Sequence, residues 1–252
     1  MKKKQIILAT VLSVFTSLSC LAESWWHQLE VTARIGYNLG GTAPFGLPAS
    51  IRSLESYKMP NNSVFELDGT QAINESWSWS SGLRFENKDM LVDARVKNYH
   101  MAMVQGQSAM EGMFTGYVHT EVRQWMVTLP VQVSYHVHPR INLRAGVYGS
   151  YLLTKSFTGN AYNGYLRVGS PTGAKIELGN DLGTRGDYDF SSDMRNFQFG
   201  IVTGVDFHVY RRIGLYADVN WGLTGIHKSS FKTIEQTLYP VYGTIGLSYK
   251  IK

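Results

Sequence analysis

The stretch that decides the fold is WMVTLPVQVSYHV HPR INLRAGVYGSYLL, residues 125–153. In its first arm, apolar side chains occupy every second position from Trp125 to Val137, and most of the positions between them are polar. The second arm, from Ile141 onward, repeats this alternation after a turn of three residues. Alternation with period two is typical of a β-strand, because successive side chains of a strand point to opposite faces. The stretch therefore predicts a β-hairpin with two long arms.

The length of the two arms points to a membrane. An ordinary strand holds about 5 to 6 residues, whereas each arm keeps its alternation for roughly twice that. The apolar face spans ten positions in each arm, from Trp125 to Tyr135 and from Ile141 to Tyr151. Ten residues at ~3.3 Å each, tilted by ~40°, rise ~25 Å, which is the height of the apolar band of an outer-membrane β-barrel. Aromatic girdles mark both interfaces of that band.

Similar alternation recurs along the chain, and the connections form a second pattern. Short periplasmic turns and long outer loops are characteristic of outer-membrane barrels. Here turns of three or four residues alternate with long links. The turns are 86–89, 138–140 and 210–213, and the long links are 41–75, 100–122, 154–195 and 224–238.

We therefore predict an all-β protein: an eight-stranded antiparallel up-and-down transmembrane β-barrel with long extracellular loops. A count of ten strands stays open if a long link contains a hairpin. The predicted strands cover about 29–39, 76–85, 90–99, 125–137, 141–153, 196–209, 214–223 and 239–251.

The first residues, MKKKQIILATVLSVFTSLSCLAES, have a basic end, an apolar run and then small residues. This pattern predicts a Sec signal peptide over residues 1–22, cleaved after Ala22, followed by a single barrel domain over 23–252. Cleavage would remove Cys20, the only cysteine, and so exclude disulfides and thiolate chemistry. A lipoprotein starting at Cys20 is disfavoured, because Ser17 stands where an aliphatic residue is wanted.

Composition alone resembles that of a soluble protein, with 44% hydrophobic residues and a mean hydropathy of −0.15. Only a barrel could span a membrane with this composition, because alternation hides half of its apolar signal. The formal charge of +5 falls to about +2 without Lys2, Lys3 and Lys4. We therefore expect no nucleic-acid partner.

Charged residues fall on the strand face opposite the aromatics. Eight strands leave an interior just wide enough to be filled by side chains, and unpaired buried charges are costly. We therefore predict a plugged lumen crossed by ion pairs. A soluble sandwich or lipocalin-like barrel also alternates, but its apolar face would point inward and its strands would be short. The predicted inward charges are Arg34, Arg84, Arg95, Lys97, Arg144 and Lys250 with Glu30, Asp93, Asp206 and Asp218.

Several phrases resemble one known family. They are GYNLGG (36–41), LPVQVSYHV, GVYGSYLL and loop segments 40–57, 93–101, 164–175 and 188–200. Over nearly the whole mature chain the sequence is similar to the Bacteroidetes outer-membrane β-barrel proteins grouped as PorT-like. Asp89 departs from the family pattern, because glycine is expected at this position of the predicted turn. The resemblance implies a bacterial outer-membrane location and, as one alternative function, an accessory role in protein secretion.

Candidate chemistry is sparse, and we predict no catalytic residue, no cofactor and no metal. GSPTGAK (169–175) lacks the spacing of a phosphate loop. A metal site would require His136, His138 and His208 to converge. A lipid A-modifying enzyme, the second alternative, would need a serine, a histidine and an acid near the outer leaflet, and no local motif joins His100 or His119 to 191–193.

The main functional expectation is a non-enzymatic barrel that presents its loops for binding or adhesion, or stabilises the outer membrane. Expected partners are outer-membrane lipid and lipopolysaccharide, and an extracellular ligand or a secretion-system protein; the barrel itself is expected to be monomeric. Aromatic and adaptable polar residues suit recognition, although they could instead fold back onto the barrel rim. The predicted partner-binding residues are Tyr162, Tyr165, Arg167, Tyr188 and Phe190. Ile51, Leu54 and Tyr57 have helical spacing, which predicts a short amphipathic turn that caps the barrel mouth or lies on the outer leaflet.

Overall fold

The computed structural model describes residues 29–252, apart from 45, 47, 232 and 235. The predicted signal peptide and its cleavage site lie outside these residues. Within the described residues, no helix is long and apolar enough to cross a membrane. The elements are β1 (Glu30–Pro44), β2 (Ile51–Lys58), β3 (Ser63–Ala72), β4 (Trp77–Asn87), β5 (Met90–Gln105), β6 (Ser108–His138), β7 (Ile141–Val168), β8 (Lys175–Leu178), β9 (Gly186–Asp189), the 3-10 turn η1 (Ser191–Asp193), β10 (Phe197–Tyr210), β11 (Ile213–Gly222) and β12 (Leu238–Lys250).

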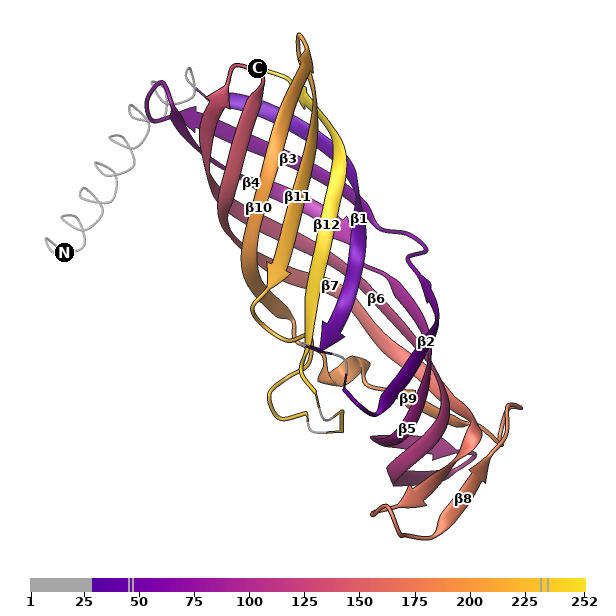
Figure 1. Cartoon of the computed structure of the whole chain (residues 1–252). Helices are drawn as coiled ribbons and strands as arrows, with labels where there is room; N and C mark the ends of the chain where they lie inside the picture. The colour runs from indigo at the N-terminus through magenta and orange to yellow at the C-terminus, as the bar shows by residue number, and fades with distance from the viewer. Residues whose placement is uncertain (1–28, 45, 47, 232, 235) are drawn as a thin grey trace, which may run out of the picture.

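The central feature is a closed ring of antiparallel strands (Figure 1). Pairing runs from β1 through β3, β4, β6, β7, β10, β11 and β12, and β12 pairs again with β1. Closure satisfies the backbone groups that an open sheet edge would leave unpaired, as a bilayer requires. The predicted all-β antiparallel barrel is confirmed, within a sheet of twelve strands.

The ring contains one strand that was not predicted and lacks one that was. The barrel strand β3 lies inside the predicted long link 41–75 and was missed, and β5 (predicted as a barrel strand over 90–99) lies beyond the ring. The predicted turn at 86–89 is also wrong, because β4 and β5 lie end to end along β6, with Asn87 opposite Trp125 and Met90 opposite Val122. The short turn lies between β3 and β4 instead.

Strands β6 and β7 continue past the ring and, together with β5, form an extension at the end opposite the short turns (Figure 1). β9 pairs with β7 and touches β5, which closes a second, smaller ring, while β2 pairs with β5 and β8 with β7. Most of the predicted links 100–122 and 154–195 is therefore strand. The helical spacing of Ile51, Leu54 and Tyr57 was misleading as well, because these residues lie in β2.

The polarity of β6 inverts along its length. We follow β6 from the short-turn end toward the extension. The buried side chains of its inner face are mostly polar as far as Gln124, and from Val122 to Phe114 they are apolar. On the outer face, apolar side chains end at Trp125, and polar ones begin at Arg123. A strand that leaves a bilayer for water requires this inversion, because its outer face then meets water and its inner face can form an apolar core.

Pro130 interrupts the ladder without a shift of register. The β4–β6 pairing runs with one register from Ser81–Val131 to Arg84–Thr128 and omits the two pairs between them. The Ser81 hydroxyl donates a hydrogen bond to the Pro130 carbonyl oxygen at 2.9 Å. A proline inside a strand often marks a β-bulge, but this pair of strands contains none at Pro130.

The outward face of β6 supplies a matched test of membrane placement. Val131, near the middle of the apolar band, and Val137, beyond the Tyr135 girdle, are both exposed on that face. Val131→Arg is expected to lower the free energy of unfolding in bilayers by about 2 to 4 kcal/mol, and Val137→Arg by about 0 to 1 kcal/mol. Denaturant titration followed by tryptophan fluorescence measures both, and equal costs would contradict the assigned depth.

Candidate functional site

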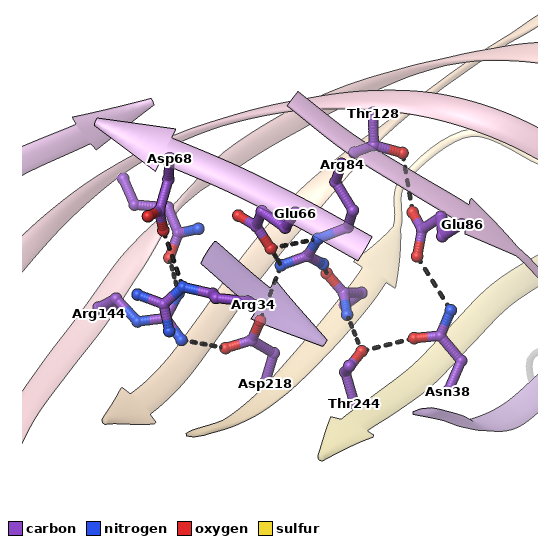
Figure 2. Close-up of polar contacts among 12 residues, drawn as sticks. Arg34, Asn38, Glu66, Asp68, Arg84, Glu86, Thr128, Arg144, Asp218 and Thr244 are labelled. Atoms are coloured by element: carbon purple, nitrogen blue, oxygen red, sulfur yellow. Dashed lines mark hydrogen bonds and ion pairs between the residues drawn. The ribbon is translucent and has the colours of Figure 1, made fainter. Parts of the chain in front are cut away.

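The interior of the ring is crossed by a network of ion pairs centred on Arg84 (Figure 2). The Arg84 guanidinium, 1% exposed, lies 2.7 Å from Glu66 and 2.9 Å from Asp218. It also donates to the side-chain oxygen of Asn220 at 3.2 Å. Because paired and hydrogen-bonded charges avoid most of the cost of burial, this arrangement allows the interior of the ring to be strongly polar.

Two aspartates extend the network by each bridging two arginines. Asp206 lies 2.5 Å from Arg34 and 2.8 Å from Arg144, and Asp218 lies 2.7 Å from Arg144. Arg34 also pairs with Asp68 at 2.8 Å. The resulting chain of charges connects strands β1, β3, β4, β7, β10 and β11 across the lumen.

A second polar layer lies nearer the extension. Glu86 accepts hydrogen bonds from Asn38 at 3.0 Å and Thr128 at 2.8 Å (Figure 2). It also pairs with Lys88 at 3.1 Å. Thr244 donates to Asn38 at 2.6 Å. This layer links β12 and β1 to β4 and β6, so side chains fill the ring over two successive levels.

The predicted inward charges are partly confirmed. Arg34, Arg84, Arg144, Asp206 and Asp218 lie in the lumen, as predicted. Glu30 and Lys250 also face inward, where they pair with each other at the open short-turn end of the ring and stay exposed. Asp93, Arg95 and Lys97 lie on β5, outside the barrel. Four further lumen charges were not predicted, because two fall in the predicted link 41–75 and two in the predicted turn 86–89. They are Glu66, Asp68, Glu86 and Lys88.

Removing Arg84 tests the lumen network. Arg84→Met is expected to lower the free energy of unfolding by about 3 to 5 kcal/mol, because Glu66 loses its ion-pair partner and Asp218 keeps only Arg144. Arg123→Met is the control, since Arg123 is 64% exposed in its pair with Glu121 and should cost about 0 to 1 kcal/mol. Urea titrations in the same lipid compare the two variants, and similar costs would contradict a buried network.

The extension has its own apolar core, in which two of the predicted partner-binding residues are buried. Tyr188 and Phe190 are 7% and 8% exposed, and their rings stack at 5.2 Å. The Tyr188 hydroxyl donates to the His119 carbonyl oxygen at 2.8 Å, and burial raises the pKa of this hydroxyl. The core also contains Val96, Met101, Met103, Phe114, Val118, Val122, Phe157, Leu166 and Leu178.

The other three predicted residues lie at the surface of the extension and are only half-buried. The ring of Tyr162 stacks on Tyr117 at 5.8 Å, and the Arg95 guanidinium lies 6.0 Å from the Tyr117 ring. Tyr165 has the Lys175 ammonium 4.6 Å from its ring and the Arg167 guanidinium at 5.8 Å. The surface thus presents two neighbouring aromatic groups with cations beside them.

The other candidate residues form no catalytic arrangement in the described part of the chain. His119 Nδ1 lies 2.6 Å from Asp93, whereas the Ser191 hydroxyl accepts a hydrogen bond from the Phe157 amide at 3.0 Å. His136 contacts Asn142 at 2.7 Å. Among the residues from 29 onward that the structure describes, no group of three or more His, Cys, Asp or Glu side chains could hold a metal ion.

His227 closes the extension core from the loop between β11 and β12. Its ring lies 4.8 Å from Phe157 and 4.6 Å from Phe231, and its Nε2 is buried without a hydrogen bond. Burial lowers the pKa of His227 to about 4, against the opposing charge of Asp193. The packed loop therefore favours the neutral ring.

The depressed pKa of His227 predicts a loop that loosens in acid. Opened His227 has its ordinary pKa near ~6.5, so between that pH and about 4 the open loop binds a proton that the packed loop does not. Loop stability should fall as the pH drops through this window. Hydrogen exchange of the Ile226 amide, which bonds to the Leu238 carbonyl oxygen, reports it. His227→Phe should remove the acid-induced change, and an unaltered change in that variant would contradict the assignment.

Comparison with known proteins agrees with this architecture. The family model described as "Outer membrane protein beta-barrel domain" matches residues 17–228. The chain belongs to this family. It is accordingly a small β-barrel protein of the bacterial outer membrane. No curated protein matches the sequence.

Three solved structures to which the chain is similar are the following barrels. Ail, the attachment invasion locus protein of Yersinia pestis, crystallised with the heparin analogue sucrose octasulfate, is 8% identical with a TM-score of 0.42, covering 89% of this chain and 99% of that one. Neisserial surface protein A is 11% identical with a TM-score of 0.35, covering 89% of this chain and 97% of that one. CarO2 of Acinetobacter baumannii is 10% identical with a TM-score of 0.43, covering 88% of this chain and 99% of that one.

Proposed function

We propose that this protein is a non-enzymatic, monomeric barrel that holds the extension outside the cell and presents it to a partner. In this proposal the eight strands of the closed ring span the membrane, with the short turns in the periplasm. The observation that carries it is the continuity of β6 and β7, which have 31 and 28 residues and run from the short-turn end through the ring into the extension. A rigid strand connection fixes a surface in a way that flexible loops cannot.

The filled lumen supports presentation rather than conduction. Arg84, Arg144 and Asp218 are all less than 5% exposed and bind one another across the ring. An ion or solute would have to break these pairs to pass. The extension accounts for a large part of the chain that a simple pore would not need.

The surface formed by Arg95, Tyr117, Tyr162, Tyr165 and Arg167 is the proposed contact area. Tyrosine offers rigid, amphipathic contact area at a small entropic cost, and arginine adds directional hydrogen bonds. Tyr117 and Tyr162 are already stacked, so little side-chain freedom remains to be lost on binding. In this proposal Arg123, exposed on β6 beside the Trp125 girdle, would contact lipopolysaccharide head groups.

The PorT-like resemblance supports an alternative, an accessory role in protein secretion. Both roles use an outward surface, so they differ in the partner rather than in the site. Capture of secretion-system proteins would favour the accessory role, and capture of a glycan or of a foreign protein would favour adhesion.

Partner capture from intact cells tests the contact area. Tyr165→Ala with Arg167→Ala should reduce recovery of crosslinked partners by at least tenfold, because the variant loses the aromatic ring and one of its cations. The matched control is Tyr210→Ala with Arg211→Ala, a tyrosine and arginine in contact at 5.1 Å at the short-turn end. Quantitative mass spectrometry measures recovery, and equal recovery from both variants would refute this surface.

A further inference from the structure

An apolar cavity of about 170 Å³ lies where the extension meets the barrel. Its walls come from the end of β1, from β2, β5, β6, β7 and β9, from Phe190 before η1, and from Ile234 and Leu238 near the start of β12. The side chains that shape it include Ala94, Val96, Val118, Phe157 and Phe190. The cavity thus occupies the boundary between the polar lumen and the apolar core of the extension.

The chemistry of the walls disfavours water. None of the described residues that line the cavity is charged. The Tyr57 hydroxyl donates to the Gly40 carbonyl oxygen, and the Tyr188 hydroxyl bonds to Thr120 as well as to the His119 carbonyl oxygen. A buried water needs two to four polar partners, and these hydroxyls are already engaged. Thr42 and Tyr99 add two further hydroxyls to a lining that is otherwise apolar, so an occupant must be held mainly by apolar contact.

The cavity has a side entrance beside β2. Strand β1 stays paired with β12 as far as Pro44, but its pairing with β3 ends at Tyr37. Past that point the cavity wall on this side includes the side chains of Leu54 and Tyr57, which are 51% and 42% exposed. Side chains can rotate aside in nanoseconds, whereas parting two paired strands is much slower. An apolar molecule can therefore enter without opening the barrel.

We infer that this cavity binds a small uncharged hydrocarbon, about the size of one aromatic ring. Dry cavities of ~150 Å³ lined by aliphatic and aromatic side chains bind benzene or xenon in other proteins. A peptide segment is too large, and a charged ligand would meet no opposite charge. The inference is independent of the proposed partner surface, because the cavity uses other residues and another chemistry.

Fluorobenzene binding, followed by 19F NMR on the protein in lipid nanodiscs, tests the inference. The unaltered chain should show saturable binding above that of empty nanodiscs. Ala94→Phe should weaken it at least tenfold, because Ala94 is buried at the cavity wall and a phenyl ring would fill the space. Ala145→Phe is the control, since Ala145 is exposed on the outward face of β7 and the added ring would face lipid.

Folding is checked by heat-modifiable migration on gels, and Ala94→Leu replaces Ala94→Phe if the larger ring prevents folding. Absence of saturable binding by the unaltered chain would overturn the inference, as would equal binding by the filled and unaltered proteins. Native mass spectrometry adds a third outcome. A lipid retained by the unaltered chain and lost from Ala94→Leu would show that an acyl chain occupies the cavity, and would also overturn the inference.

Discussion

The polarity that each strand face must show to its surroundings governs this structure. In the bilayer every backbone group needs a partner within the protein, which a closed ring provides, and the outward side chains must be apolar. The inward side chains are then free to be polar, provided that they satisfy one another. Arg84, held between Glu66 and Asp218 at 2.7 and 2.9 Å, meets that condition. Closure of the ring and pairing of the lumen charges therefore depend on each other.

Beyond the membrane the same strands obey the opposite requirement. Past Trp125, the outer face of β6 turns polar and its inner face contributes Val122, Val118 and Phe114 to an apolar core. Two rings of opposite interior chemistry are thus stacked on shared strands. Side chains of the polar layer cannot fill space next to the apolar layer without losing hydrogen bonds, which gives a physical reason for a cavity at their junction.

The predictable parts of the fold were those with long, regular alternation. The hairpin of β6 and β7 was recognised because its alternation lasts through the whole bilayer. β3 was missed because only Phe65 and Leu67 are large apolar residues on its outward face. Because β3 was missed, Glu66 and Asp68 were not predicted to lie in the lumen. β5 alternates like a barrel strand, but its apolar face points into the extension. Likewise, a mix of aromatic and polar residues suits both a recognition loop and a small core. The sequence therefore left open whether Tyr188 and Phe190 bind a partner or pack against the barrel rim.

Spin-label accessibility along β6, in bilayers and in a Cys20→Ser background, tests the inversion of polarity most directly. Collision rates of single labels with oxygen report lipid contact, and those with a water-soluble nickel chelate report water contact. The account predicts oxygen contact at Leu129, Val131 and Val133, nickel contact at His119, Glu121 and Arg123, and little of either at Val118 and Val122. Oxygen contact throughout the odd positions, or no period of two, would contradict it.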